Sequence, residues 1–406
     1  MTTYRTAIRR GLAVRRTPHR PPRRGGKTQH GSIVAPVAAT VAATLAATAL
    51  VRAGAALAKA ERDRRHRAQR ERERKFALLP GERPAEGLRR IALGQVDLVL
   101  ELLEGEIDRT AAPRTVHETR KALKRLRALV RLLRDELPEG EFERENATLR
   151  DLGRRLAGAR DGEVMVSTLE QLLKRNPRKL GRRRSLAMLH DRLAAERDRA
   201  AVSTLLGDSS TRRELIDEVR ALRSRVFQWR LTEHPGMAVA EPGLQRIYSQ
   251  GRGRYRRAAR AGGDRTRAMH EWRKRVKDLR HAAEMLDRSG PGGGEHARHG
   301  RRARGGRRQA RRRREAARIR RLAHRADALG EVLGEEHDLA AFAERVRSDG
   351  VLALGRPTRK ALLRMIAKRR RQLRRRALRQ GERIYRRRPR AFAARVRDAY
   401  ARAAGV

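Results

Sequence analysis

Two segments of the chain repeat one spacing of histidine, arginine and lysine. The segment VHETRKALKRLRALVRLL, residues 116–133, aligns without gaps with MHEWRKRVKDLRHAAEML, residues 269–286. The basic positions are His117, Arg120, Lys121, Lys124, Arg127 and Arg131 in the first copy and His270, Arg273, Lys274, Lys277 and Arg280 in the second. On a helix, most of these side chains would follow one edge and recur about every 5 Å. Such a row can bind a linear polyanion through charge-assisted hydrogen bonds to phosphate oxygens.

An apolar stripe lies one residue away from each basic row. The stripe residues are Val116, Leu123, Leu126, Val130 and Leu133 in the first copy and Met269, Trp272, Val276, Leu279, Ala283 and Leu286 in the second. Their spacing predicts two amphipathic helices that bury this stripe against neighbouring helices. The basic rows therefore adjoin the core, where crowded cations are costly unless anions neutralise them.

A second pair of segments repeats in the same order, which indicates a duplicated unit. DLGRRLAGARDGEVM, beginning at residue 151, matches ALGEVLGEEHDLAAF, beginning at residue 328. The match pairs Asp161 with Asp338, for which helix capping or pairing with arginine is a better reading than catalysis. We expect a first half over about 76–233 and a second over about 244–402. An Arg/Gly-rich insertion at about 291–316 accounts for the longer spacing in the second half.

The composition of the 406 residues favours helices and a polyanionic partner. Lys and Arg number 102 against 47 Asp and Glu, which gives a formal net charge of +55. A field of that sign attracts polyanions or acidic surfaces. The absence of cysteine excludes disulfides and Cys-ligated metal sites, and only 3% aromatic residues argues against extensive stacking on bases. Abundant Ala, Leu, Arg and Glu predict an all-α fold.

Residues 1–75 are expected to form a basic, partly disordered extension outside the folded unit. The extension contains an uncharged Ala- and Thr-rich stretch over residues 33–51, of roughly transmembrane length. Such residues drive insertion weakly, and Arg52 follows at once. We therefore favour an Ala-rich helix over a membrane anchor, and the anchor stays open.

The ordered set of motifs resembles the CHAD family, the conserved-histidine α-helical domain. The resemblance is carried by the two His-x-x-Arg-x-x-x-Lys-x-Leu-Arg segments, the Leu-Gly…Asp segments and the opening FALLPGERPAEGLRRIALGQ, and it covers about 76–402. It implies two helical bundles of a duplicated four-helix type, related by a pseudo-twofold axis, with a basic cavity between them. It also implies binding of inorganic polyphosphate by the repeated histidines and basic rows. The implied location is the cytoplasm, at polyphosphate granules.

The repeated histidines have three open roles: anion contact in the cavity, a buried structural role, or metal ligation. Each has cations at i+3 and i+4 where a helical metal site would place further ligands, so we expect no metal and no cofactor. An anion contact would strengthen in acid, since histidine charges below about pH 6.5.

We therefore expect a non-catalytic polyphosphate-binding protein. The alternative is a non-specific nucleic-acid binder of nucleoid type that uses the Arg-rich segments. An enzyme is disfavoured, because the acids are scattered among arginines and no Gly-rich phosphate loop is present. The sequence does not determine the oligomeric state.

Overall fold

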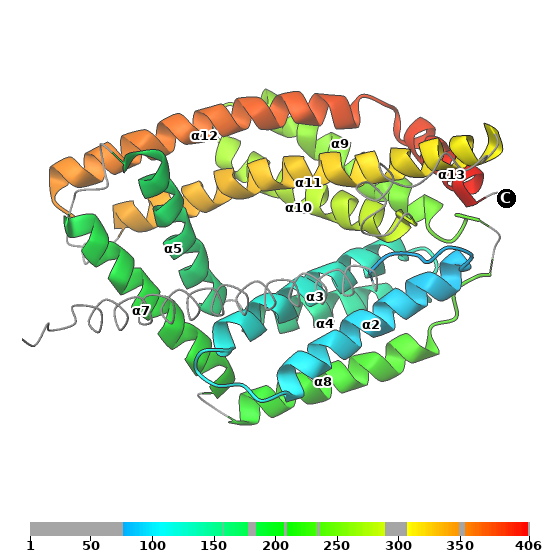
Figure 1. Ribbon diagram of the computed structural model, residues 1–406, viewed down its shortest axis with the longest axis horizontal. Coiled ribbons are helices and arrows are strands. Elements are labelled where there is room, and N and C mark those ends of the chain that lie inside the picture. The colour runs from blue at the N-terminus through cyan, green and yellow to red at the C-terminus, as the bar shows by residue number, and fades with distance from the viewer. Residues whose placement is uncertain are drawn as a thin grey trace, which may run out of the picture. The chain divides into compact units, whose positions relative to one another are not determined.

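The computed structural model describes residues 76–156, 158–177, 184–206, 209–233, 236–288, 307–348 and 354–404 (Figure 1). All of them belong to one compact unit that spans residues 67–406. The described residues form helices joined by turns and loops. The helices are α2 (Pro84–Glu104), α3 (Ala112–Leu132), α4 (Glu141–Arg155), α5 (Gly158–Arg175), α7 (Arg184–Leu206), α8 (Ser209–Gln228), α9 (Glu241–Arg260), α10 (Arg265–Leu286), α11 (Arg307–Ser348), α12 (Arg356–Tyr385) and α13 (Pro389–Ala404).

Proline marks the beginning of several helices. It stands at the first or second position of α2, α3, α9 and α12. A proline there loses no hydrogen bond, because the first amides of a helix have no partner within it, and its fixed φ suits the helix. These prolines therefore help to fix where the four helices begin. The all-α prediction is confirmed.

The repeated segments form α3 and α10, and both predicted apolar stripes are buried. No stripe residue of either helix is more than 2% exposed. Around α3 pack α2, α4 and α7, while α9 and α11 pack against α10. The outer contacts also correspond, because α8 packs on α2 and α13 packs on α9. The pseudo-twofold axis itself stays a prediction.

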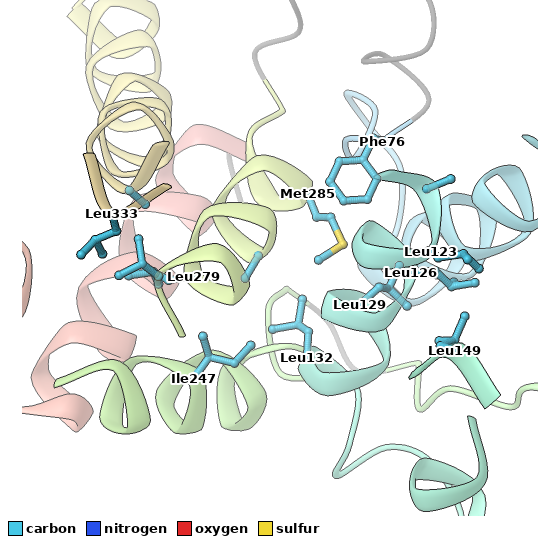
Figure 2. Packing of buried hydrophobic residues seen from close by; sticks show 14 of the residues in the cluster. Phe76, Leu123, Leu126, Leu129, Leu132, Leu149, Ile247, Leu279, Met285 and Leu333 are labelled. Atoms are coloured by element: carbon cyan, nitrogen blue, oxygen red, sulfur yellow. The ribbon is translucent and has the colours of Figure 1, made fainter. Parts of the chain in front are cut away.

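The segments predicted to form the two halves meet along α3, α9 and α10. Close packing there depends on a glycine: a Cβ built on Gly243 would lie 1.8 Å from the carbonyl oxygen of Leu132. Figure 2 shows Leu132 of α3 beside the segment that carries Ile247. The segment before α2 also crosses between the halves, since the amide of Leu78 donates to the carbonyl of Met285 at 2.9 Å. One continuous apolar core therefore joins both halves.

The structure describes only part of two further predicted segments. Helix α11 begins at Arg307, so the last third of the predicted insertion is helical, and Glu315 within it is only 5% exposed. The extension over residues 1–75, with its stretch at 33–51, lies outside the described residues. Among the helices that are described, none is long and apolar enough to cross a membrane.

Candidate functional site: a basic cleft between α3 and α10

A cleft of about 860 Å³ opens between α3 and α10, with α4, α5 and α11 completing its walls. We call it the basic cleft. Its lining includes ten Lys or Arg residues, three histidines and three acids. Because the acids leave about seven positive charges uncompensated, the cleft favours an anionic ligand. Helix α3 supplies Arg120, Lys124, Arg127 and Arg131; α4 supplies Arg150 and Arg154; α10 supplies Arg273, Lys274, Arg275 and Lys277.

On the α3 side, hydrogen bonds to α4 hold the arginines in place. The guanidinium of Arg120 donates to the carbonyl of Gly153, and Nε of Arg127 donates to Oδ1 of Asn146 at 2.9 Å. Burial and the neighbouring charge of Arg131 lower the pKa of Arg127 to about 10. Arg127 still carries its charge at neutral pH, but at a cost that a bound anion would reduce.

A buried carboxylate on α10 ties the two central helices together. Asp278 Oδ1 lies 2.7 Å from Nη1 of Arg131 on α3, and its Oδ2 lies 3.1 Å from Nη1 of Arg275. The side chains of Arg131 and Asp278 are 19% and 7% exposed. At such burial a charge needs a partner, because desolvation penalises an unpaired ion by several kcal/mol. Asp278 therefore offsets two cations at the point where the halves meet.

A pair of histidines lies at the α11 side of the cleft. Nδ1 of His270 on α10 lies 3.1 Å from Nδ1 of His337 on α11, and the ring centroids are 4.3 Å apart. We call these two residues the histidine pair. One Nδ1 must donate and the other accept, so this contact requires at least one neutral ring. Burial, and then the charge of Arg273, lower the pKa of His337 to about 3.

The pKa of His270 is lowered as well, first by burial and then by the charges of Lys274 and Arg273. Both rings are therefore neutral at physiological pH. Asp338, beside His337, lies 3.9 Å from Arg273 through its Oδ1, which agrees with the predicted pairing with arginine. The side chain of Asp161 lies outside the described set.

Eight of the eleven sequence-predicted residues line the basic cleft. They are Arg120, Lys124, Arg127, Arg131, His270, Arg273, Lys274 and Lys277. The other three do not line it. His117 is exposed at the first turns of α3, and Lys121 pairs with Glu118 at 3.6 Å. Arg280 lies 2.6 Å from both Glu284 and Asp327. These three are placed away from the cleft by the direction of the helix face and by local acids.

The sequence did not single out several residues of the cleft. Arg150 and Arg154 line it from α4, Arg275 from α10 and His337 from α11. Arg150 and Arg154 are four residues apart, a spacing that places them on one helix face and could have indicated a second basic edge. His337 precedes the repeated Asp338, and the residue aligned with it in the first half is Arg160. The repeat therefore carried no signal for a histidine there.

The donor set of the cleft does not suit a metal ion. No three His, Asp or Glu residues of the described chain converge as ligands for one. The three carboxylates lie beside cations, because Glu271 pairs with Lys274 at 2.7 Å and Asp278 with Arg131. These acids lower local repulsion between cations, and the arrangement can bind an anion with several charges.

Comparison with known proteins defines the class. The CHAD domain family matches residues 90–298, about half of the sequence, and the chain belongs to this family. Among solved structures, PptA from Streptomyces chartreusis is similar at 19% identity, over 75% of this chain and 99% of that protein, with a TM-score of 0.49. The CHAD domain from the plant Ricinus communis is similar at 18% identity, over 80% and 92%, with a TM-score of 0.41. No curated protein matches the chain.

Proposed function

We propose that this protein binds inorganic polyphosphate in the basic cleft without cleaving it. The observation that carries the proposal is that ten Lys and Arg side chains from α3, α4 and α10 line one cleft with three acids among them. Polyphosphate carries a charge on every repeat unit and lacks apolar parts, so charge-assisted contacts can hold it along its length. Membership of the CHAD family supports the same ligand, and association with polyphosphate granules would follow from it.

The placement of the cations favours a chain-like anion over a compact one. Residues of α3 at positions 120, 124, 127 and 131 recur once per turn, about 5–6 Å apart. The facing helix α10 presents Arg273 and Lys277 at the same interval. Two facing rows can follow successive phosphates of one strand, whereas a single phosphate would engage only one step of each row.

Charge reversal across the cleft tests the proposal. The cleft double variant, Arg127→Glu with Lys277→Glu, places one acid on each central helix. Its matched control, Arg364→Glu with Lys368→Glu, makes the same change in charge at two exposed positions of α12 that do not line the cleft. Long-chain polyphosphate affinity, measured by calorimetry on the full chain, should fall at least tenfold in the first variant. It should change less than threefold in the control, since distant charges are screened.

Equal affinity of the two variants would refute the cleft as the site. Arg127 is half-buried, so thermal unfolding checks that the cleft double variant folds. If it does not, Arg150→Glu with Lys274→Glu repeats the test at exposed positions of the same cleft. Duplex DNA at equal phosphate concentration should fail to displace polyphosphate from the parent. Displacement would favour the nucleic-acid alternative, and phosphate release from bound polyphosphate would overturn binding without catalysis.

A further inference from the structure

A second pocket lies outside the basic cleft, where α11, α12 and α13 meet. Its volume is about 290 Å³, close to the lower end of pockets that bind small molecules. Seven arginines line it, and none of its lining residues is an acid. Six of them are Arg321, Arg325, Arg383, Arg386, Arg387 and Arg395. The seventh, Arg318, pairs with Glu315 at 2.6 Å. We call this site the arginine pocket.

The arginine pocket holds more unneutralised charge for its size than the basic cleft. Across the described residues, no carboxylate forms an ion pair or hydrogen bond with the other six guanidinium groups. Partial desolvation and the neighbouring charges of Arg387 and Arg318 lower the pKa of Arg395. Like charges held together repel, and a bound anion with several charges would remove that repulsion.

The floor of the arginine pocket is apolar and packs against the core. Ile319, Ile384, Phe392 and Val396 form it, each less than 10% exposed. Tyr248 stacks on Phe392 from the core side, with ring centroids 3.7 Å apart and planes 9° apart. A floor held in place in this way is preorganised to bind a flat or apolar group.

The junction between α12 and α13 is held by the same tyrosine. The Tyr248 hydroxyl donates to the carbonyls of Ile384 and Arg387 at 3.0 and 3.3 Å. This fixes the chain where Arg386 and Arg387 enter the rim, immediately before α13 begins at Pro389.

We propose that the arginine pocket binds a nucleoside polyphosphate. The nucleobase of this ligand would lie on the apolar floor of the pocket, with arginine side chains able to stack on it. The phosphates of the ligand would contact the arginines of the rim. The apolar floor distinguishes this site from one for inorganic polyphosphate, which has no group to bury there. The number of rim arginines distinguishes it from a site for an alkyl phosphate, which carries only one phosphate group.

Binding of the fluorescent nucleotide mant-ATP to the full-length protein tests the proposal. The pocket variant changes Arg321, Arg325, Arg386 and Arg395 to Gln, all exposed and on the rim. The control variant makes the same four changes at Arg371, Arg375, Arg376 and Arg379, which are exposed on α12 and outside the pocket. Nucleotide affinity should fall at least tenfold in the pocket variant and less than threefold in the control. Equal affinity of these two variants would overturn the proposal.

Competition separates the arginine pocket from the basic cleft. In the cleft double variant, mant-ATP should still bind within threefold of the parent, and loss of binding there would overturn the proposal. In that background ATP should displace mant-ATP at a concentration at least fivefold lower than tripolyphosphate or octyl phosphate. If tripolyphosphate displaced mant-ATP as well as ATP does, the pocket would be a general anion-binding surface. If octyl phosphate displaced mant-ATP better than ATP does, the pocket would be a site for an alkyl chain. Either result refutes a nucleotide site.

Discussion

Replacement of Asp278 by Asn should separate the stability of the protein from its affinity for polyanions. The variant removes one negative charge from a site where the carboxylate contacts Arg131 and Arg275. Both arginines then remain partly buried without a counter-charge. Removing one partner of a buried pair costs about 3–5 kcal/mol. We expect about 3 kcal/mol for Asp278→Asn, because the amide oxygen still accepts one hydrogen bond.

The loss of stability should be visible as a thermal shift. For a domain of this size, about 2 °C of melting temperature corresponds to each kcal/mol, so the midpoint should fall by about 6 °C. Asp217→Asn is the matched control, because its side chain is 71% exposed and pairs with Arg220 at 3.4 Å on the same helix. An exposed pair of this kind contributes at most about 1 kcal/mol, so the control should lose about 2 °C or less.

Polyphosphate affinity should change in the opposite direction. Arg131 and Arg275 lose the carboxylate that competes with a bound phosphate for their charge. One added unit of positive charge beside a phosphate contributes about 1 kcal/mol in a well-solvated site. Calorimetry at low salt should therefore show about fivefold tighter binding, and saturating polyphosphate should restore part of the lost melting temperature. A variant as stable as the parent would refute the role of Asp278 at the α3–α10 contact. A folded variant that binds polyphosphate more weakly would refute the electrostatic account of the cleft.

Three further outcomes follow from the structure. Gly243→Ala forces a methyl group against the carbonyl of Leu132 and should destabilise the protein by about 1–3 kcal/mol in denaturant unfolding, whereas Gly253→Ala, in the same helix with open space around it, should be neutral or stabilising. Polyphosphate affinity should rise as pH falls from 7.5 to 5.5, because a bound anion raises the low pKa values of the histidine pair. The rise can reach about tenfold per pH unit for each proton taken up. Replacing both rings by Gln should flatten this pH profile, and His190→Gln, outside the cleft, should leave it unchanged. A plot of log affinity against log salt should fall steeply for the parent, and the cleft double variant should lose about two units of slope.

The histidine pair also makes the stability of the ligand-free protein depend on pH, with the opposite sign. Because the pKa of His337 is about 3 when folded and near the ordinary value when unfolded, the unfolded chain binds the proton first. The contribution of His337 to the stability of the free protein should therefore decrease as pH falls below about 6.5 and level off near pH 3. Bound polyphosphate should weaken this loss, since it raises the pKa of the folded state.

Helical periodicity explains why much of the cleft was predictable from the sequence. The apolar stripes of α3 and α10 fix which face of each helix is buried, and the basic rows beside them then lie at the edge of the core. Periodicity predicts which face of a helix is buried, however, and not how far along the helix a neighbouring helix covers that face. His117 lies on a turn of α3 that extends past the cleft, whereas its counterpart His270 meets His337 on α11.

Contacts between segments that lie far apart in the chain could not be predicted from the sequence. Arg280 repeats the position of Arg127, yet Asp327 of α11 pairs with it at 2.6 Å and it does not line the cleft. Arg150 and Arg154 reach the cleft because α4 packs on α3, a contact that no local pattern specifies. The arginine pocket likewise depends on how α12 and α13 meet α11. In the sequence, its arginines could therefore not be distinguished from the general excess of arginine.

The two long walls of the basic cleft differ in continuity. On one side α11 runs unbroken for 42 residues and supplies His337 and Asp338. On the other side the equivalent length is divided, since α4 ends at Arg155 and α5 begins at Gly158, and both parts contribute to the lining. The divided wall is also joined to the continuous one, because Arg175 of α5 forms an ion pair with Glu335 of α11, and this pair fixes α5 relative to the residues of α11 that line the cleft.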